Sequence, residues 1–536
     1  MTADQDQADY IVIGAGPGGS AVAARLAGSE GRPHVVVLEA GPARVPLLSD
    51  VPLGIAALVP LRSRYNYAYE TVPQPALGGR RGFQPRGRGL GGSSLINAMI
   101  YMRGQPQDYD GWAAAGCAGW AWHDVLPYFK RSEDNARGAD AWHGVGGLLR
   151  VEDLRERNPA TAAFVEAAVR AGYAFNADFN GASQEGVGTY QVFQRNGRRC
   201  SAGRAYLQTG KHMPNIDLRA DAQAQRILFE GRRAIAVAYL RGGRQEVLHA
   251  RREIIVAAGA FGSPQLLMLS GIGPAQHLRE HGIDVLMDAP EVGGNLQDHC
   301  DYTINLRAKA KGLFGLTLPV GGQVLAALYP YFRHGRGMLT SNAAEAGGFL
   351  RSRADIERPD LQLHFCIGFV DDHNRKLHLG TGMALHVCGL RPKSRGEVRL
   401  ASSAPQEAPR IDPNFLADPD DLETLLRGVQ MAQKIIAEPP LATFSSDALY
   451  GTGRDDPAAL RDLIREHADT IYHPVGTCRM GADARSVVDP HLRVRGAENL
   501  RIADAAIMPA IISGNTQAPT AMIGEKAADL ILGRSG

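Results

Sequence analysis

The stretch from Tyr10 to Ser20 carries glycines at a spacing that suits phosphate binding. Gly14, Gly16 and Gly19 follow an apolar run typical of a buried strand and precede a helical pattern. Gly14 permits a tight turn, Gly16 lets backbone N–H groups approach a pyrophosphate, and Gly19 lets the helix pack on the strand. Pro17 lies in the same turn. The expected ligand is a nucleotide diphosphate.

A second apolar strand, Val35 to Leu38, ends in Glu39 and Ala40. Glu39 follows Gly14 at close to the spacing of roughly 20 residues expected for the acid that binds a ribose 2′-hydroxyl. Its charge would repel a 2′-phosphate, so the prediction is an adenosine with a free ribose, from FAD or NAD. The alternative is a solvated glutamate at a strand end.

Two polar residues near the C-terminus could take part in proton chemistry. His473 lies in the segment YHPVGTCRMG, and an imidazole that titrates near neutral pH can accept a proton. A structural hydrogen-bonding role is equally open for this histidine. Asn515 precedes a predicted helix from about Thr520 to Leu532, so a loop or helix cap is its alternative role.

The elements that must position these residues can be read from apolar patterns. The region from Glu39 to Arg64 predicts a loop over the nucleotide, and the glycine-rich Pro73–Gly92 stretch leads to Gly91, Gly92 and Ser93. The backbone there could meet a second flat or anionic part of the ligand, and a linker is the alternative. Toward the middle of the chain, the patterns predict an amphipathic helix (158–173), a β meander (216–237) that turns at Glu230-Gly231, and a buried strand (253–257). Further on they predict strand-like runs (361–398) and two helices (420–437 and 457–467).

Composition limits the class of protein. The chain has 536 residues and should form two domains, while its net charge of +2 argues against a nucleic-acid binder. Six cysteines without a CxxC pair predict free thiols and no metal site. The polar, acidic start MTADQDQAD is not a secretory signal, so a cytoplasmic location is expected.

One uncharged segment, Gly312 to Phe332, has nearly the length of a membrane span between Lys311 and Arg333. Pro319, Gly321, Gly322 and Pro330 interrupt it. A buried or interfacial element is therefore expected, with peripheral membrane contact as a further possibility.

Four ordered segments resemble the glucose-methanol-choline oxidoreductases, a family of FAD enzymes that oxidise alcohols. The segments are IVIGAGPGGS with Glu39, RGLGGSSLINAMIYMRG, GAFGSPQLLMLSGIG with VGGNLQDH, and YHPVGTCRMG with SGNTQAPTAMIGEKAADLI. They cover essentially the whole chain. Within the family, the chain is most similar to the choline-dehydrogenase-like and aliphatic alcohol dehydrogenase branch.

The resemblance implies an α/β Rossmann-like FAD-binding domain interleaved with an α+β substrate domain built on an antiparallel sheet with helices. The implied boundaries are 1–150, 213–304 and 485–536 for the FAD domain, and 151–212 and 305–484 for the substrate domain.

The family's active-site histidine falls on His473, which would be the sole base, and its partner position falls on Asn515, which would orient the alcohol oxygen. The backbones of Thr516 and Gln517 would face the flavin N1 and C2 carbonyl. Further cofactor contacts implied by the resemblance are Asn97, Ala98, Ala224, Gly259, Asp504 and Ala505. Asp298 and His299 receive no catalytic role.

The resemblance also implies a reaction: oxidation of a primary alcohol to an aldehyde, with electrons passed to a quinone or other acceptor. Some relatives bind the flavin through a histidine at the position of Ile96, so a non-covalent FAD is expected here. An oxidase that uses O2 and a flavin-containing lyase remain alternatives. The identity of the alcohol stays open; Glu345, Phe365 and Phe369 lie in the expected substrate domain, the two aromatics more plausibly as core residues.

Overall fold

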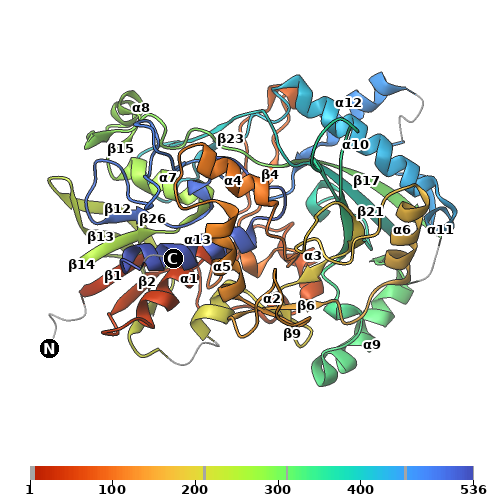
Figure 1. Ribbon diagram of the computed structural model, residues 1–536, viewed down its shortest axis with the longest axis horizontal. Coiled ribbons are helices and arrows are strands. Elements are labelled where there is room, and N and C mark those ends of the chain that lie inside the picture. The colour runs from red at the N-terminus through yellow and green to blue at the C-terminus, as the bar shows by residue number, and fades with distance from the viewer. Residues whose placement is uncertain (1–5, 209–212, 310–311, 452–455, 535–536) are drawn as a thin grey trace.

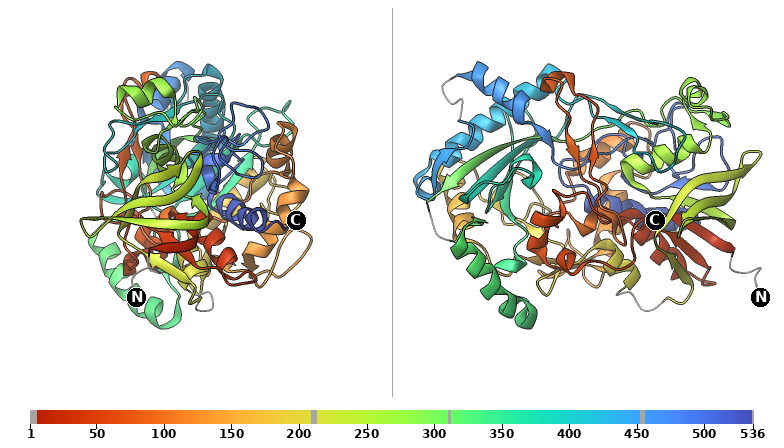
Figure 2. Two further views of the ribbon diagram at one scale, coloured as in Figure 1. Left: turned by 90° about the vertical axis from the view of Figure 1, so that its left-hand side faces the viewer. Right: turned by 180° about the vertical axis from the view of Figure 1, so that it is seen from behind.

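The computed structural model describes residues 6–208, 213–309, 312–451 and 456–534. Two sheets lie at opposite ends of the molecule, as the views from the front and from behind both show (Figures 1 and 2). The α/β class with a second, antiparallel sheet is confirmed. The sheets leave between them the space in which the candidate site forms.

The nucleotide-binding sheet has seven strands, with β1 (Gln7–Ile13) in its middle. Strand β1 pairs in parallel with β2 (Val35–Leu38) and β14 (Arg244–Val256), and β26 (Leu500–Ile502) continues the parallel set beyond β14. The buried residues of these four strands are mainly Val, Ile and Leu, as expected for parallel strands covered on both sides. Segments far apart in the sequence thus build one sheet.

The predicted meander is correct only in part. Strands β12 (Ala222–Glu230) and β13 (Arg233–Arg241) form the expected hairpin, which turns at Gly231 with a φ of 59°. Strand β11 (Ile216–Arg219) instead pairs in parallel with β2 at the sheet edge. Its apolar residues complete the nucleotide-binding sheet. A local sequence pattern could not indicate this pairing with a distant strand.

Helices α1 (Pro17–Ala27) and α13 (Gln517–Ile531) pack against each other beside this sheet (Figure 1). Their contact is close because both carry glycine: a Cβ on Gly524 would stand 2.3 Å from the carbonyl oxygen of Gly18. Helix α13 is buried from Gln517 to Asp529. The predicted start of this helix near Thr520 is therefore three residues late.

The second sheet is antiparallel and has eight strands. Its main path runs through β24 (Ser445–Ala448), β17 (Cys300–Ala308), β21 (Gly380–Gly389), β20 (Leu361–Cys366), β19 (Ala344–Leu350) and β7 (Gly186–Thr189). Short strands β18 (Gly315–Leu316) and β25 (Asp469–Thr470) pair with β21 and β17. Helices α6 (Pro159–Arg170), α10 (Pro419–Ala437), α11 (Pro439–Ala442) and α12 (Pro457–His467) cover its outer side (Figure 1).

Strand β20 shows how this sheet divides its side chains. Leu361, Leu363 and Phe365 pack in the core beneath α6 and α10, and Phe365 stacks on Phe164 with ring centroids 4.9 Å apart. Successive side chains of a strand point to opposite faces, so Gln362 and His364 point the other way. That inner face borders the site.

The expected domain boundaries remain a proposal. Two of the four expected boundaries cut through strands: 150/151 lies within β6 (Leu149–Asp153), and 304/305 lies within β17, which begins at Cys300. We propose that the second of these junctions lies just before Cys300. The expected loop after Glu39 contains short helices, α2 (Leu47–Asp50), a 3-10 turn (Pro52–Gly54) and α3 (Ile55–Leu58).

The uncharged segment forms helix α9 (Leu318–His334), and Lys311 before it lies outside the described residues. Pro319 occupies the first turn, where a missing N–H costs nothing, and Pro330 lies in the last part of the helix. The helix is not interrupted as the sequence suggested. Within the described ranges, no helix is long and apolar enough to cross a membrane. The six cysteines are buried free thiols.

Candidate active site

A side chain at each of the three glycines of the first turn would have a different consequence. Gly14 adopts a φ of 101°, and a Cβ there would stand 2.4 Å from the carbonyl oxygen of Ala257. A Cβ on Gly19 would stand 2.0 Å from the carbonyl oxygen of Gly14. A Cβ on Gly16 would meet no protein atom within 4 Å, because Gly16 faces a cavity. The turn thus leaves room for a ligand at Gly16 alone.

Glu39 lies at the same end of the sheet and is buried. Its carboxylate accepts hydrogen bonds from the backbone N–H groups of Ala15 (2.9 Å), Gly41 (2.8 Å) and Gly89 (2.9 Å). A carboxylate offers about four acceptor positions, so one remains for a ribose hydroxyl. Glu39 therefore both holds the glycine turn and faces the cavity, although burial raises its pKa.

The cavity has a volume of about 1050 Å³ and extends between the two sheets. This is at the upper limit of the roughly 300–1,000 Å³ typical of small-molecule sites. It brings together most of the predicted site residues: Gly14, Gly16, Pro17, Glu39, Ala40, Gly92, Ser93, Asn97, Ala98, Ala224, Gly259, His473, Asp504, Ala505, Asn515, Thr516 and Gln517. Gly19 and Gly91 do not line it; they shape the turns behind the wall, where Gly91 donates its N–H to the Ala15 carbonyl.

The N-terminus of α13 opens onto the cavity at Thr516 and Gln517. The first turn of a helix leaves backbone N–H groups without intrahelical partners and carries the positive end of the helix dipole. Asn97 donates to the Gln517 side-chain oxygen, while the buried Gln517 Nε2 has no partner among the described residues. This wall of the cavity is thus suited to an acceptor or a developing negative charge.

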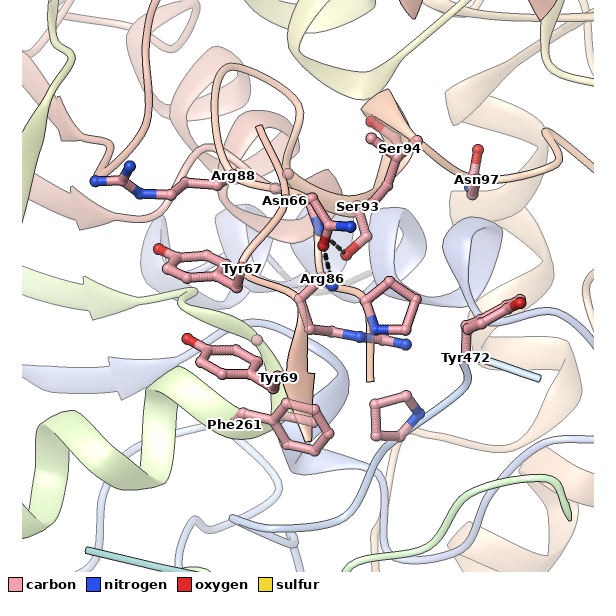
Figure 3. A pocket seen from close by; sticks show the side chains of 18 of the residues that line it. Asn66, Tyr67, Tyr69, Arg86, Arg88, Ser93, Ser94, Asn97, Phe261 and Tyr472 are labelled. Atoms are coloured by element: carbon pink, nitrogen blue, oxygen red, sulfur yellow. Dashed lines mark hydrogen bonds between the residues drawn. The ribbon is translucent and has the colours of Figure 1, made fainter. Parts of the chain in front are cut away.

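Asp504 organises another part of the cavity wall. Its carboxylate accepts hydrogen bonds from Gly259 N (2.8 Å) and Ser263 Oγ (2.6 Å), at the start of α7 (Gly259–Leu269). Burial raises its pKa. Figure 3 shows Tyr67, Tyr69 and Phe261 along the same cavity, with the two tyrosine rings stacked at 5.0 Å between centroids.

His473 is presented by a strained turn. Tyr472 before it has a φ of 76°, which a bulky residue adopts only when its surroundings enforce it. Asp298 supplies that enforcement: its carboxylate accepts from the His473 backbone N–H (2.8 Å) and from Thr470 Oγ1 (2.5 Å), and Thr470 Oγ1 accepts from Tyr472 N (2.7 Å). Asp298, which the sequence left without a function, therefore holds the turn.

The His473 ring contacts two polar side chains. Its Nδ1 lies 3.0 Å from His299 Nδ1, and its Nε2 lies 3.1 Å from Asn515 Nδ2. Burial, followed by the positive charges that His299 and His364 would carry if protonated and by that of Arg86, lowers the pKa of His473 well below its ordinary value of 6.5. The imidazole is neutral at pH 7 and can accept a proton.

Three residues around this pair were missed by the sequence reasoning. Gln362 donates to Asn515 Oδ1 at 3.0 Å. His364 lines the cavity, and neither of its ring nitrogens makes a hydrogen bond of normal geometry within the described chain; burial lowers its pKa to about 3. Arg86 points into the cavity beside Tyr472 (Figure 3). Strand alternation in LQLHFC could have placed Gln362 and His364 on one face, but not beside Asn515.

Glu345 is excluded from the site. Its carboxylate accepts from Thr161 Oγ1 (2.6 Å), Asn158 N (2.8 Å) and Ser341 Oγ (2.6 Å), so it holds the start of α6. It does not line the cavity.

A Rossmann-like sheet with this glycine turn, joined by one cavity to a neutral histidine and an asparagine, defines a dinucleotide-dependent oxidoreductase. The GMC oxidoreductase family matches the chain over residues 8–301 with its N-terminal part and over residues 392–524 with its C-terminal part. The chain belongs to this family.

Individual relatives agree. An "Alcohol dehydrogenase [acceptor]" of Pseudomonas putida is 45% identical, over 98% of this chain and 95% of that protein. An "Oxygen-dependent choline dehydrogenase" of Brucella anthropi is 40% identical, over 99% and 96%. Among solved structures, pyridoxine 4-oxidase from Mesorbium loti has a TM-score of 0.89 at 29% identity, covering 99% of this chain and 100% of that one. Formate oxidase from Aspergillus oryzae RIB40 has a TM-score of 0.90 at 26% identity, covering 99% of both.

The chain is an FAD-dependent enzyme of the alcohol dehydrogenase and choline dehydrogenase branch. The residues present fit this cofactor. Gly16 leaves open the space that a Cβ would fill, Glu39 keeps one acceptor position, and Gln517 offers a buried donor.

Proposed function

We propose that this enzyme oxidises a primary alcohol to an aldehyde, with His473 as the base. The observation that supports this most directly is the contact between His473 Nε2 and Asn515 within the cavity that begins at the glycine turn. Bound FAD supplies the hydride acceptor, N5 of its flavin. His473 takes the hydroxyl proton, and Asn515 Nδ2–H orients the substrate oxygen.

The surroundings of the base favour this role. A neutral imidazole in a buried site needs no proton to be removed before the reaction, and the donor groups of Asn515 and α13 face the side where negative charge develops. We assign Thr516 and Gln517 to the flavin N1 and C2 carbonyl. We further propose that FAD is bound non-covalently, because Ile96 lines the cavity where some relatives carry a histidine.

The substrate we propose is an uncharged alcohol. A quaternary ammonium such as choline needs an aromatic or acidic partner. Glu345, the acid expected in this domain, is occupied with α6, and the guanidinium of Arg86, which points into the cavity beside Tyr472, would repel a quaternary ammonium.

The test is an anaerobic titration of the yellow protein with 1-alkanols, benzyl alcohol and choline, following flavin absorbance. Bleaching by an uncharged alcohol, at concentrations where choline has no effect, is the expected result. Absence of bleaching by every alcohol, with FAD shown to be bound, would overturn the proposal and favour the lyase alternative.

We propose a quinone or similar carrier as the electron acceptor, supported by the resemblance to the "Alcohol dehydrogenase [acceptor]". Admission of air to the bleached enzyme distinguishes this from the oxidase alternative. Slow recolouring that a soluble quinone accelerates supports the dehydrogenase; fast recolouring in air alone contradicts it.

Peripheral membrane contact through α9 is a further part of the proposal. Its Val320, Ala327 and Tyr331 are buried, whereas Leu318 (95% exposed), Leu325 (70%) and Tyr329 (73%) face outward. A helix with such an apolar outer face suits the boundary of a bilayer. The wild-type protein should sediment with phospholipid vesicles, and a Leu318→Ser, Leu325→Ser variant should remain in the supernatant; equal behaviour of the two would contradict the proposal.

A further inference from the structure

A chain of hydrogen bonds runs through the active site between two backbone carbonyl groups. From one end to the other it joins the Leu390 carbonyl, His299, His473, Asn515, Gln362, Tyr190 and the Leu363 carbonyl. A carbonyl oxygen can only accept a hydrogen bond. Starting from each terminal carbonyl, the donor and the acceptor of every following hydrogen bond can be assigned in turn. The two series of assignments both reach the ring of His473.

The first end is Leu390. Its carbonyl oxygen lies 3.1 Å from His299 Nε2, so this nitrogen carries the proton. Hydrogen bonds to the backbone carbonyls of Leu390 and Ile512 raise the pKa of His299. Burial has the larger effect and lowers this pKa to about 4. A neutral imidazole has one N–H, so His299 Nδ1 holds a lone pair. It accepts from His473 Nδ1 at 3.0 Å, which must therefore carry a proton.

The second end is Leu363. Tyr190 donates its hydroxyl to the Leu363 carbonyl at 2.5 Å, so its oxygen accepts the contact from Gln362 at 3.3 Å. The Gln362 atom in that contact is the amide nitrogen, which also donates to Asn515 Oδ1 at 3.0 Å. The Asn515 amide nitrogen is then the atom that faces His473 Nε2. This nitrogen of His473 accepts, and so it carries a lone pair.

Both ends give His473 the same tautomer, with Nδ1–H toward His299 and the lone pair of Nε2 toward Asn515. We propose that His299 is a positioning residue that holds the base in this tautomer and stabilises the imidazolium formed when Nε2 takes the hydroxyl proton. The inference rests on the proposed function only in that His473 is the base.

The chemistry of His299 has two consequences. The proton moves from the alcohol oxygen to His473 Nε2, and the Nδ1–H···Nδ1 bond to His299 strengthens as the His473 ring becomes positive. His299 cannot pass a proton onward, because its Nε2–H ends at a carbonyl. The proton can therefore leave His473 only toward the cavity.

Asparagine and leucine at position 299 form a matched pair for the test, since they have nearly the same shape and only asparagine offers an acceptor. Both lose the bond to Leu390. We expect His299→Asn to keep kcat within about threefold of the wild type, and His299→Leu to lose about 10- to 100-fold in kcat with little change in KM, a fraction of the roughly 10²–10⁴ that a general base contributes.

The second measurement is independent of turnover. In the FAD-loaded wild type labelled with ¹⁵N-histidine, the ring signals of His473, assigned by their loss in His473→Gln, should show the Nδ1–H form. In His299→Leu they should shift toward the Nε2–H form, and in His299→Asn they should not. If His299→Leu does not fold, the ring signal of His473 in the wild type still tests the proposed tautomer.

A wild-type His473 protonated at Nε2, or a His299→Leu variant with unchanged kcat and tautomer, would overturn the proposal. A wild type that oxidises no alcohol but shows the Nδ1–H signal would instead remove the proposed function and leave the tautomer assignment standing.

Discussion

Gly19 lies directly against Gly14, so close that a Cβ on Gly19 would stand 2.0 Å from the Gly14 carbonyl oxygen. Gly16, between them, has free space where its Cβ would be. The same motif therefore contains one glycine required by the protein and one required by the ligand.

This contrast predicts different effects for Gly16→Ala and Gly19→Ala. Gly16→Ala should change the free energy of unfolding of the FAD-free protein by less than about 0.5 kcal/mol and weaken FAD binding at least about tenfold, a loss of about 1.4 kcal/mol. Gly19→Ala should cost roughly 1–3 kcal/mol by overpacking. Urea unfolding and flavin titration measure the two quantities; equal destabilisation by both variants would contradict the assignment.

Replacement of His473 by glutamine should lower the rate of alcohol-dependent flavin bleaching by about 10²–10⁴ while FAD remains bound. The reason is that Gln cannot accept the hydroxyl proton. Stopped-flow absorbance of FAD-loaded protein measures the rate. Bleaching of this variant at the wild-type rate would show that another residue is the base.

The lowered pKa of His473 predicts the pH dependence of kcat/KM. The base is active when unprotonated, so activity is lost as pH falls through its pKa, which lies well below 6.5. We expect kcat/KM to be level from pH 6.5 to 8 and to decline only in more acidic solution. A decline already centred at pH 7 or above would contradict this prediction.

Asn515→Leu keeps the shape of the side chain and removes the donor that faces His473 Nε2 and, as we propose, the substrate oxygen. Loss of one such donor costs about 10²–10³ in kcat in other enzymes. We expect a decrease of about that size, with FAD content unchanged as the control. A change confined to KM would assign Asn515 to ground-state binding alone.

His364 is buried beside the cavity, and neither of its ring nitrogens makes a hydrogen bond of normal geometry with the described residues. Such a group lowers stability unless a ligand satisfies it. His364→Leu should therefore raise the thermal midpoint by a few degrees and raise KM for the alcohol several-fold. Differential scanning calorimetry and steady-state kinetics test the pair of effects, and a lower midpoint with unchanged KM would contradict a substrate contact.

Acid precipitation should release all of the flavin into the supernatant. Ile96 packs with Leu58, Val59 and Leu95 at the position where a histidine could form a bond to the flavin, and a hydrocarbon side chain cannot do so. Flavin fluorescence that stays with the precipitated protein would contradict non-covalent binding.

Much of the nucleotide-binding part could be predicted from sequence because its signals are local. The strand, the glycine turn and Glu39 lie within about thirty residues, and each residue type has one clear physical purpose. The hairpin turn at Gly231 and the helices α10 and α12 were predicted for the same reason.

The surroundings of His473 could not be predicted in this way. His299, Gln362 and His364 come from strands or loops more than 100 residues before it, and only the pairing of β17, β21 and β20 brings them to one face. Strand β11 was misassigned for a similar reason, since its partner β2 lies about 180 residues earlier. Local patterns contain no information about such pairings.

The position of β26 and α13 in the chain constrains how the protein can be made. Strand β1 and helix α1 emerge from the ribosome long before α13, which covers α1, and β26, which completes the parallel strands beside β14. Contacts of such long sequence separation form slowly. The glycine turn and α1 therefore lack the cover of α13 for most of translation, and the parts of the FAD site come together only after α13 has been made.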